Sequence, residues 1–237
     1  MTQAVILAGG LGTRMAAWSS DLPKSLLVVA GRPFIAWQLE RIQSCAFTRV
    51  VLCVGHRASP IFDFVGDGSR FGLRVEYSDE GEQKLGTLGA LRHALGLLDE
   101  CFLVTYGDSF LPFDYSAPLR DLVQHPQAIG TMSVFLNQGR WDVSNTRVVG
   151  DHVERYEKGG GEPGLDYIDY GALALRRSAI EPIQAGVPLG LDSLQAELAG
   201  SGSLRALVVT ERFYEIGSPE GLRDLELMLT QGDGAAG

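Results

Sequence analysis

Apolar runs of strand length recur along the first half of the chain. Residues 4–8 (AVILA), 50–54 (VVLCV) and 101–106 (CFLVTY) are almost continuously apolar. Runs of this kind are typical of strands buried on both faces. The segment 73–78 (LRVEYS) predicts a further strand.

The segments between these strands have helical spacing. Behind Pro33, a residue favoured at helix starts, one helix is predicted by the recurrence of Ile35, Leu39, Ile42 and Ala46. A short helix is expected near 59–65, and an amphipathic helix is predicted by Leu88, Leu91, Leu95 and Leu98. The β-α-β-α order implies an α/β protein whose mainly parallel sheet has helices on both faces.

The second half is less regular. Strand-like runs occur at 129–136, 146–149 and 168–175, and helices are predicted at 192–199 and 219–229. Fewer helices separate these strands, which favours antiparallel additions over one end of the sheet.

Composition and charge narrow the class of partner. The chain has 237 residues, of which 45% are hydrophobic, and a formal net charge of −9. A general binder of nucleic acid or anionic membrane needs a basic face, so neither partner is expected. Small anionic substrates remain compatible with this charge, because local cations and backbone amides can outweigh a distant negative surface.

The cysteines and the apolar runs predict a cytoplasmic location. The three cysteines have no CxxC spacing, which fits a reducing compartment. The N-terminus has no basic segment before its short apolar run, so no signal peptide is expected. No apolar stretch approaches the roughly 20 residues needed to span a bilayer.

A glycine-rich segment follows the first strand, and it carries the strongest chemical signal. Residues 7–14 read LAGGLGTR, with glycine at Gly9, Gly10 and Gly12. Glycines allow the backbone amides to approach phosphate oxygens closely. Thr13 adds a hydroxyl, while Arg14 and Lys24 add charge to match a triphosphate with about four negative units. The alternative is a glycine-rich turn with surface cations.

Two other glycine motifs do not fit this segment. A dinucleotide-binding GxGxxG from Gly10 would need glycine where Met15 stands, and no acidic residue follows about 20 positions later. A phosphate-binding P-loop requires GK[ST], whereas Lys24 follows Pro23. These departures disfavour a Rossmann oxidoreductase.

Asp108 directly follows the strand predicted at 101–106. A carboxylate at the tip of a buried strand is well placed to hold Mg²⁺, which favours oxygen ligands and bridges phosphate oxygens. The alternative is an aspartate that caps the following turn.

These motifs together resemble the sugar-1-phosphate nucleotidyltransferase family. The resemblance rests on LAGGLGTRM, DLPKSLLVVAGRPF and LGTLGALRHAL, and runs from residue 3 to about residue 226. It is greatest to the short heptose-1-phosphate guanylyltransferases and N-acetylmuramate-1-phosphate uridylyltransferases. The resemblance implies a Rossmann-like three-layer α/β/α fold with a mostly parallel mixed sheet. It also implies magnesium-dependent transfer of a nucleoside monophosphate from an NTP to a sugar 1-phosphate, with release of pyrophosphate.

The expected organisation is a single domain over residues 1–230. Its nucleotide-binding half would cover about 1–112 and its sugar-binding half about 113–230, followed by a flexible tail at 231–237. A monomer or a homodimer is expected.

The resemblance also implies roles for individual residues at the nucleotide and metal sites. Leu7 and Ala8 would contact the base through their backbone, together with Gly86 and Thr87, although these last two could simply begin a helix capped by Thr87. Asp108 would bind magnesium. Glu215 stands where the family carries the second aspartate, and a surface pair with Arg212 is its alternative interpretation.

The sugar site is expected to use residues of the second half. Glu157 and Lys158 resemble the family's Glu-Lys-Pro segment, in which Glu binds ring hydroxyls and Lys contacts the sugar phosphate; a solvated loop pair is the alternative. Asp169 and Gly171 fall where relatives carry Asn-x-Gly. Asn145 is a further candidate, although a turn residue is the more ordinary interpretation.

GTP and a heptose 1-phosphate are the expected substrates, on overall resemblance, and the NDP-sugar would serve surface polysaccharide or glycoconjugate synthesis. Uridylyl or thymidylyl transfer to another sugar 1-phosphate, such as N-acetylmuramate 1-phosphate or glucose 1-phosphate, is the alternative. A non-catalytic relative that binds nucleotide sugars would be expected to lose Arg14, Lys24 or Asp108, but all three are present.

Overall fold

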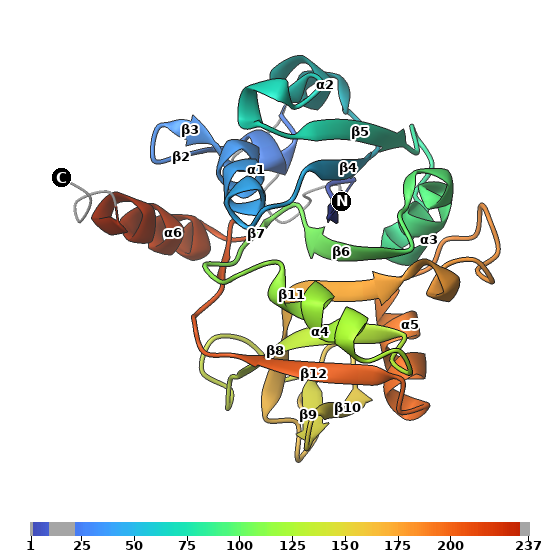
Figure 1. Cartoon of the computed structure of the whole chain (residues 1–237). Helices are drawn as coiled ribbons and strands as arrows, with labels where there is room; N and C mark the ends of the chain where they lie inside the picture. Colours follow the sequence, from blue (N-terminus) through green and yellow to red (C-terminus); the bar gives the residue numbers. More distant parts are fainter. Residues whose placement is uncertain (1, 10–21, 233–237) are drawn as a thin grey trace.

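The computed structural model describes residues 2–9 and 22–232 (Figure 1). Its main sheet has the strand order β5-β4-β1-β6-β11-β8-β12-β10-β9. These strands are β1 (Gln3–Leu7), β4 (Arg49–Val54), β5 (Arg74–Asp79), β6 (Cys101–Tyr106), β8 (Gly130–Leu136), β9 (Thr146–Val149), β10 (His152–Tyr156), β11 (Tyr167–Arg176) and β12 (Leu204–Val209). The helices are α1 (Phe34–Ser44), α2 (Ser59–Val65), α3 (Gly86–His93), α4 (Ala117–Gln124), α5 (Leu191–Gly200) and α6 (Pro219–Gly232).

The direction of the strands changes along the sheet. β5, β4, β1 and β6 are all parallel to their neighbours in this group. β11 is antiparallel to β6 on one side and to β8 on the other, while β12 runs parallel to β8. Because the first four strands are parallel, their carboxyl ends meet at one edge, where α/β proteins bind ligands.

Helices cover both faces of this sheet. Alternate residues of β1 divide between two apolar cores, with Ala4 and Ile6 in one and Val5 and Leu7 in the other. The first core includes residues of α1, α2 and α4, and the second includes residues of α3 and α5. A continuous apolar strand is thus explained by burial on both faces. The predicted three-layer α/β architecture with a mixed sheet is confirmed.

A third apolar cluster connects the end of the chain to the edge of the sheet. β2 (Val28–Val29) pairs with β3 (Arg32–Pro33), and β7 (Ser109–Phe110) pairs with β13 (Tyr214–Glu215). α6 lies beside these short strands (Figure 1). The buried members of this cluster are Val29, Phe34, Phe110, Ile216, Leu225 and Leu229. Their packing brings residues near position 215 next to the end of β6.

One predicted helix is wrong in its length. The helix predicted by Leu88 to Leu98 ends at His93, and a 3₁₀ turn (Leu95–Leu97) follows. Gly96 lies in this turn, and glycine in a helix interior costs about 1 kcal/mol relative to alanine. Leu98 is still buried, at 3% exposure, but in extended backbone that leads into β6.

Among the described residues, no helix is both long and apolar enough to cross a membrane.

Candidate active site

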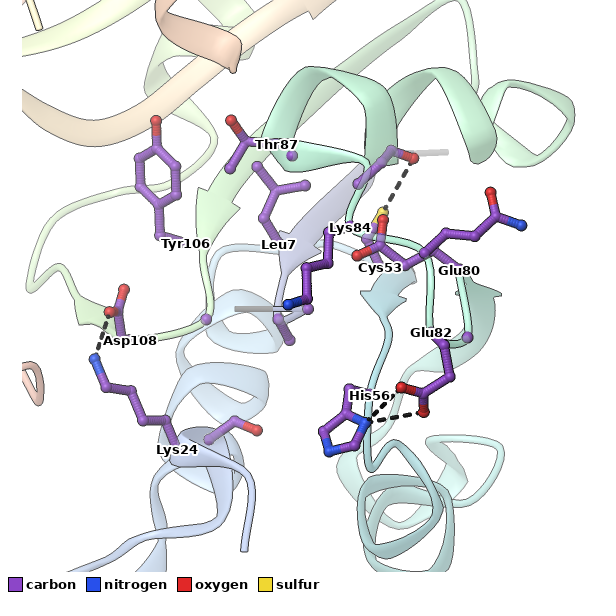
Figure 2. Close-up of a pocket in the computed structure, with 18 residues that line it drawn as sticks. Leu7, Lys24, Cys53, His56, Glu80, Glu82, Lys84, Thr87, Tyr106 and Asp108 are labelled. Carbon is purple, nitrogen blue, oxygen red and sulfur yellow. Dashed lines mark hydrogen bonds and ion pairs between the residues drawn. The ribbon is translucent and has the colours of Figure 1, made fainter. Parts of the chain in front are cut away.

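The carboxyl ends of β1, β4 and β6 border a cleft with a volume of about 580 Å³ (Figure 2). Seven residues predicted from the sequence line it, namely Leu7, Ala8, Gly9, Lys24, Gly86, Thr87 and Asp108. They come from distant parts of the chain, and the parallel strand order brings them together. The predicted Gly10, Gly12, Thr13 and Arg14 lie outside the described residues.

Two glycines allow the backbone to pack tightly around the cleft. Gly107 lies so close to β1 that a Cβ there would be 2.9 Å from the Ala8 Cα atom. Gly86 has a positive φ of 70°, and a Cβ there would lie 2.5 Å from the Leu189 carbonyl oxygen. Either side chain would force these segments apart.

The hydroxyl of Thr87 is used within the protein. Its Oγ1 atom accepts a hydrogen bond of 2.7 Å from the backbone N–H of Leu191, at the start of α5. Thr87 therefore satisfies a free amide of α5 rather than of its own helix α3. Its side chain still borders the cleft.

Asp108 lies on a turn that is fixed by a buried side chain beneath it. Gln38, which is fully buried on α1, donates hydrogen bonds to the carbonyl oxygens of Tyr106 (2.8 Å) and Ser109 (2.7 Å). The Nζ atom of Lys24 donates to Asp108 Oδ2 at 3.3 Å. The Asp108 side chain is 37% exposed and that of Lys24 is 12% exposed. A ligand in the cleft can therefore reach the carboxylate.

The pairing of β7 with β13 places Glu215 beside Asp108. Glu215 is opposite Ser109, and the Ile216 N–H donates to the Asp108 carbonyl oxygen at 3.0 Å. A Cβ on Gly217 would lie 3.7 Å from Lys24 Nζ and 4.0 Å from Glu215 Oε2. One position beside the end of β6 is therefore bordered by three charged side chains, those of Lys24, Asp108 and Glu215.

Arg212, the residue expected as the alternative partner of Glu215, has an acidic partner elsewhere. Its guanidinium lies 2.5 Å from the carboxylate of Asp224, on α6.

The donor set beside Lys24 suits magnesium. Within the described part of the chain, no group of three or more His, Cys, Asp or Glu side chains gathers around a metal position. Mg²⁺ usually keeps several waters and takes one or two carboxylates together with phosphate oxygens of a substrate. Two neighbouring carboxylates, Asp108 and Glu215, at the edge of a cleft fit this pattern.

Three of the predicted sugar-site residues meet at β11 together with Gln195, in a group that we name the β11 cluster: Asn145, Asp169, Gly171 and Gln195. Asp169 Oδ1 accepts the Gly171 N–H at 2.9 Å, and its Oδ2 atom accepts Gln195 Nε2 at 2.7 Å. Asn145 Oδ1 accepts the Asp169 N–H at 2.9 Å. The Glu157 N–H in turn donates to the Asn145 carbonyl oxygen at 2.9 Å, which joins the segment around 157 to the cluster.

Burial raises the pKa of Asp169, and the hydrogen bonds from Gly171 and Gln195 partly offset that rise. The neighbouring irregularity in the pairing of β11 with β8 includes Gly171, whose φ is +93°.

The side chains of Glu157 and Lys158 have partners of their own. Glu157 binds Arg155, and Lys158 Nζ lies 2.8 Å from Asp192 Oδ1. The Lys158 side chain is 71% exposed. Both side chains therefore lie at the surface rather than inside the β11 cluster.

Tyr106 connects the cleft with the β11 cluster. It lines the cleft, and a Cβ on Gly171 would lie 3.6 Å from its ring. Burial raises the pKa of the Tyr106 hydroxyl, and the nearby Asp169 carboxylate raises it further. The hydroxyl therefore stays protonated at neutral pH.

The opposite wall of the cleft carries charges that the sequence reasoning missed. Glu80, Glu82 and Lys84 lie between β5 and α3, and His56 Nδ1 is 2.9 Å from Glu82 Oε1. In Figure 2 the Lys84 side chain extends into the cleft. These residues directly follow β5, and ligands bind at the carboxyl ends of parallel strands. The same rule led to Asp108, so it could have identified them as well.

The nucleotidyl transferase family model matches residues 3–142, which is more than half of the chain. The chain belongs to this family. The predicted family resemblance is confirmed, and Lys24 and Asp108 both lie in the matched part of the nucleotidyl transferase sequence.

Named members of the family align with different shares of the chain. N-acetylmuramate alpha-1-phosphate uridylyltransferase of Neisseria meningitidis serogroup B is 38% identical over 128 residues, covering 54% of this chain and 55% of that protein. The chain therefore matches about half the length of this relative. D-glycero-alpha-D-manno-heptose 1-phosphate guanylyltransferase of Campylobacter jejuni is 27% identical over 218 residues, covering 92% of this chain and 96% of that protein.

The crystal structure of HddC from Yersinia pseudotuberculosis complexed with GMP-PN has a TM-score of 0.81 and 26% identity. The superposition covers 97% of this chain and 100% of HddC. The nucleotidyl transferase chain, including the elements beyond the matched family model, thus follows the Rossmann-like fold of HddC.

Proposed function

We propose that this chain transfers a nucleoside monophosphate from an NTP to a sugar 1-phosphate, with release of pyrophosphate. The observation that carries the proposal is the meeting of Lys24 and Asp108 in one cleft at the carboxyl edge of the parallel strands, with Glu215 placed beside them by the pairing of β13 with β7. Membership of the nucleotidyl transferase family supports it.

The proposed reaction is an in-line displacement at the α-phosphorus of the NTP. An oxygen of the sugar phosphate forms the new bond, and the bond to pyrophosphate breaks. Because the attacking oxygen is already ionised near neutral pH, no general base is required. The protein acts by positioning the two substrates and neutralising their charge.

Lys24 is proposed to move from Asp108 to the α-phosphate, since it borders the cleft and its Nζ atom is already near the cleft's carboxylate. Lys158 would likewise leave Asp192 and contact the sugar phosphate, which its exposed position permits. Arg14, which lies outside the described residues, is proposed to hold the β- and γ-phosphates.

Asp108 and Glu215 are the residues proposed to hold Mg²⁺. Bound there, the ion would supply neutralisation of the negative charge on the substrate phosphates. Without a bound cation, the two carboxylates would repel the substrate phosphates, because like charges repel at short range.

The β11 cluster is proposed as the wall of the sugar site. Tyr106 separates it from the nucleotide cleft, and Asn145 and Asp169 hold its backbone in place. The absence of a side chain at Gly171 lets the Tyr106 ring pack against this backbone. The side chains of Glu157 and Lys158, at the exposed rim, remain the proposed contacts to hydroxyls and phosphate.

GTP and a heptose 1-phosphate are the proposed substrate pair. The match over nearly the full length to the heptose 1-phosphate guanylyltransferase of C. jejuni supports this choice. The test is pyrophosphate release in Mg²⁺ with ATP, CTP, GTP, UTP and dTTP, each against a panel of sugar 1-phosphates. We expect the fastest release with GTP and a heptose 1-phosphate. Release with none of the pairs would overturn the transferase proposal.

A further inference from the structure

Lysine is rare in this chain and is found near the proposed substrates. Of the 20 lysine and arginine residues, three are lysines: Lys24, Lys84 and Lys158. Lys24 lines the cleft, and Lys158 is the proposed contact to the sugar phosphate. Lys84 lines the cleft as well, but the reaction as proposed above gives it no role. Because the lysine ammonium is a compact charge that commonly binds phosphate, a lysine in this cleft is suited to a phosphate ligand.

The backbone that carries Lys84 is held on both sides. Before it, the Gln83 N–H donates to the Glu80 carbonyl oxygen at 3.1 Å, in the turn that follows β5. After it, Leu85 is buried, and its carbonyl oxygen accepts the Leu189 N–H at 2.8 Å. The Lys84 side chain itself is exposed. Binding of a ligand would therefore order one side chain and not a loop, which keeps the entropic cost small.

Lys84 and Lys24 differ in their charge partners. The Lys24 amine contacts Asp108 at 3.3 Å. The Lys84 side chain, in contrast, makes no ion pair and no hydrogen bond among the residues that the structure describes. The nearby Glu82 is bound by His56 instead. Lys84 therefore brings to the cleft a positive charge that no described side chain neutralises.

The proposed reaction needs such a charge. The triphosphate carries about four negative units. The two carboxylates proposed to hold Mg²⁺, Asp108 and Glu215, offset the charge of that ion, so the phosphates depend on cationic side chains. For the triphosphate, the proposed cations are Lys24 and Arg14, of which Arg14 lies outside the described residues. They leave about half of the negative charge unmatched.

The direction of the Lys84 side chain fits the leaving group. In Figure 2 it extends into the cleft from the side opposite Tyr106 and Asp108. Tyr106 borders the β11 cluster, from which the sugar phosphate is proposed to approach. In an in-line displacement the attacking and leaving oxygens lie on opposite sides of the α-phosphorus. Pyrophosphate would therefore depart away from the β11 cluster, on the side from which Lys84 extends.

We propose that Lys84 binds the β- and γ-phosphates of the NTP, the part that leaves as pyrophosphate, from the wall opposite Lys24. The inference rests on the proposed function for the place of the sugar phosphate, and it deepens that function by naming a residue that stabilises the leaving group. The ammonium donates hydrogen bonds to phosphate oxygens. When the bond from the α-phosphorus to the bridging oxygen breaks, its electron pair stays on that oxygen, and Lys84 offsets the added charge without a proton transfer.

Inorganic pyrophosphate and GMP separate the leaving group from the rest of the nucleotide. The direct test is the dissociation constant of each, measured by calorimetry in Mg²⁺ for the unaltered chain and for Lys84→Met. Methionine keeps an unbranched side chain but carries no charge. Pyrophosphate affinity should fall about 10- to 100-fold, the range of a hydrogen bond to a charged group. GMP affinity should be unaltered.

Two further variants test charge and position. Lys84→Arg keeps the charge and should retain more pyrophosphate affinity than Lys84→Met. Arg223→Met removes one positive charge from an exposed position on α6, outside the residues that line the cleft, and should leave pyrophosphate affinity unaltered. In turnover, Lys84→Met should raise the KM for GTP and lower kcat, because the contact strengthens as charge develops on the leaving group. Thermal unfolding of each variant shows whether the fold is retained.

Each failure has a distinct meaning. A folded Lys84→Met variant with unaltered pyrophosphate affinity, or one that loses GMP affinity alone, would overturn the role of Lys84. An equal loss in Arg223→Met would assign the effect to net charge and would overturn it too. Pyrophosphate binding that depends on Lys84, without transfer to any sugar 1-phosphate, would support the role of Lys84 and overturn the transferase. Transfer at an undiminished rate in Lys84→Met would overturn the role of Lys84 alone.

Discussion

Two aspartates at the edge of the sheet have opposite surroundings. Asp108 follows β6 with more than a third of its side chain exposed, and its carboxylate contacts the amine of Lys24. Asp169 lies in β11, where the Gly171 N–H and the Gln195 amide occupy its two oxygens. One carboxylate is available to a ligand, whereas the other is bound to the protein itself.

This difference separates residues that act on substrate from residues that shape the site. A carboxylate whose oxygens already accept hydrogen bonds from the backbone and a buried amide has little capacity left for a ligand. Asp169 is therefore expected to act on stability, and Asp108 on turnover. Substitutions at the two positions test whether Asp108 acts on turnover and Asp169 on stability.

The largest effect is expected for Asp108→Asn. Loss of its charge should lower the rate of pyrophosphate release by about 10²–10³-fold, because charge stabilisation in the transition state is lost. The fold should remain, since the turn is held by backbone contacts to Gln38. Steady-state rates and thermal unfolding measure both quantities.

Asp63→Asn, at an exposed position on α2, provides the matched control for Asp108→Asn. It makes the same chemical change outside the residues that line the cleft and should leave the rate unaltered. A near-normal rate in Asp108→Asn would contradict the role of Asp108.

The next effect is on stability. Asp169→Ala should lower the free energy of unfolding by about 1–3 kcal/mol, because the Gly171 N–H and the Gln195 amide lose their acceptor. GTP affinity should not change. Urea unfolding and calorimetry test the two statements. A variant with unaltered stability but weaker GTP binding would assign Asp169 to the nucleotide instead.

Asp169→Asn tests the charge of this side chain separately. Gln195 Oε1 is buried without a hydrogen-bond partner among the described residues, so rotation of the Gln195 amide would present an acceptor to the amide group that the substitution introduces. Because burial raises the pKa of Asp169 above its ordinary value of 3.8, the folded state binds the proton more tightly than the unfolded chain. The contribution of this proton to stability is therefore complete below pH 3.8 and is lost as the pH rises through the folded-state pKa.

The Asp169→Asn variant lacks this contribution. Its free energy of unfolding, relative to the unaltered chain, should increase as the pH rises from about 4 towards neutrality. Urea unfolding across this range measures the difference. A difference that is constant with pH would mean that the pKa of Asp169 is the same in the folded and unfolded states.

The same contrast explains what the sequence could predict. The first half of the sheet is buried on both faces, so its strands are continuous apolar runs, and the carboxyl edge of parallel strands identified Asp108. β12 was missed because Arg205 interrupts its apolar residues and four of its six positions are only partly buried or exposed. β10 was missed for a similar reason, since three of its five residues are exposed.

Side-chain partners lay beyond the sequence reasoning. Glu80 and Gln195 carry no motif, and their relation to the cleft and to Asp169 depends on contacts between segments far apart in the chain. The pairing of β7 with β13, which brings Glu215 to Asp108, depends in turn on the packing of α6. Glu215 was therefore predicted from the family resemblance and not from its spacing along the chain.

The smallest effect is expected at the boundary between the two regions. In Figure 2 the Tyr106 side chain points away from Asp108, and its hydroxyl stays protonated because burial raises its pKa. Because Tyr106 lies between the cleft and the β11 cluster, we propose that its hydroxyl donates one hydrogen bond to the sugar 1-phosphate. Tyr106→Phe removes this donor and leaves the ring. The KM for the sugar 1-phosphate should rise about 3- to 10-fold, as expected for one neutral hydrogen bond.

The dissociation constant of GTP should remain unchanged in Tyr106→Phe, because the backbone of Tyr106 is still held by Gln38. Steady-state kinetics with varied sugar phosphate, together with calorimetry for GTP, measure the two quantities on the same preparation. Weaker GTP binding with an unaltered KM for the sugar phosphate would place Tyr106 on the nucleotide side. Tyr106 would then belong to the nucleotide cleft and not to the sugar wall formed by the β11 cluster.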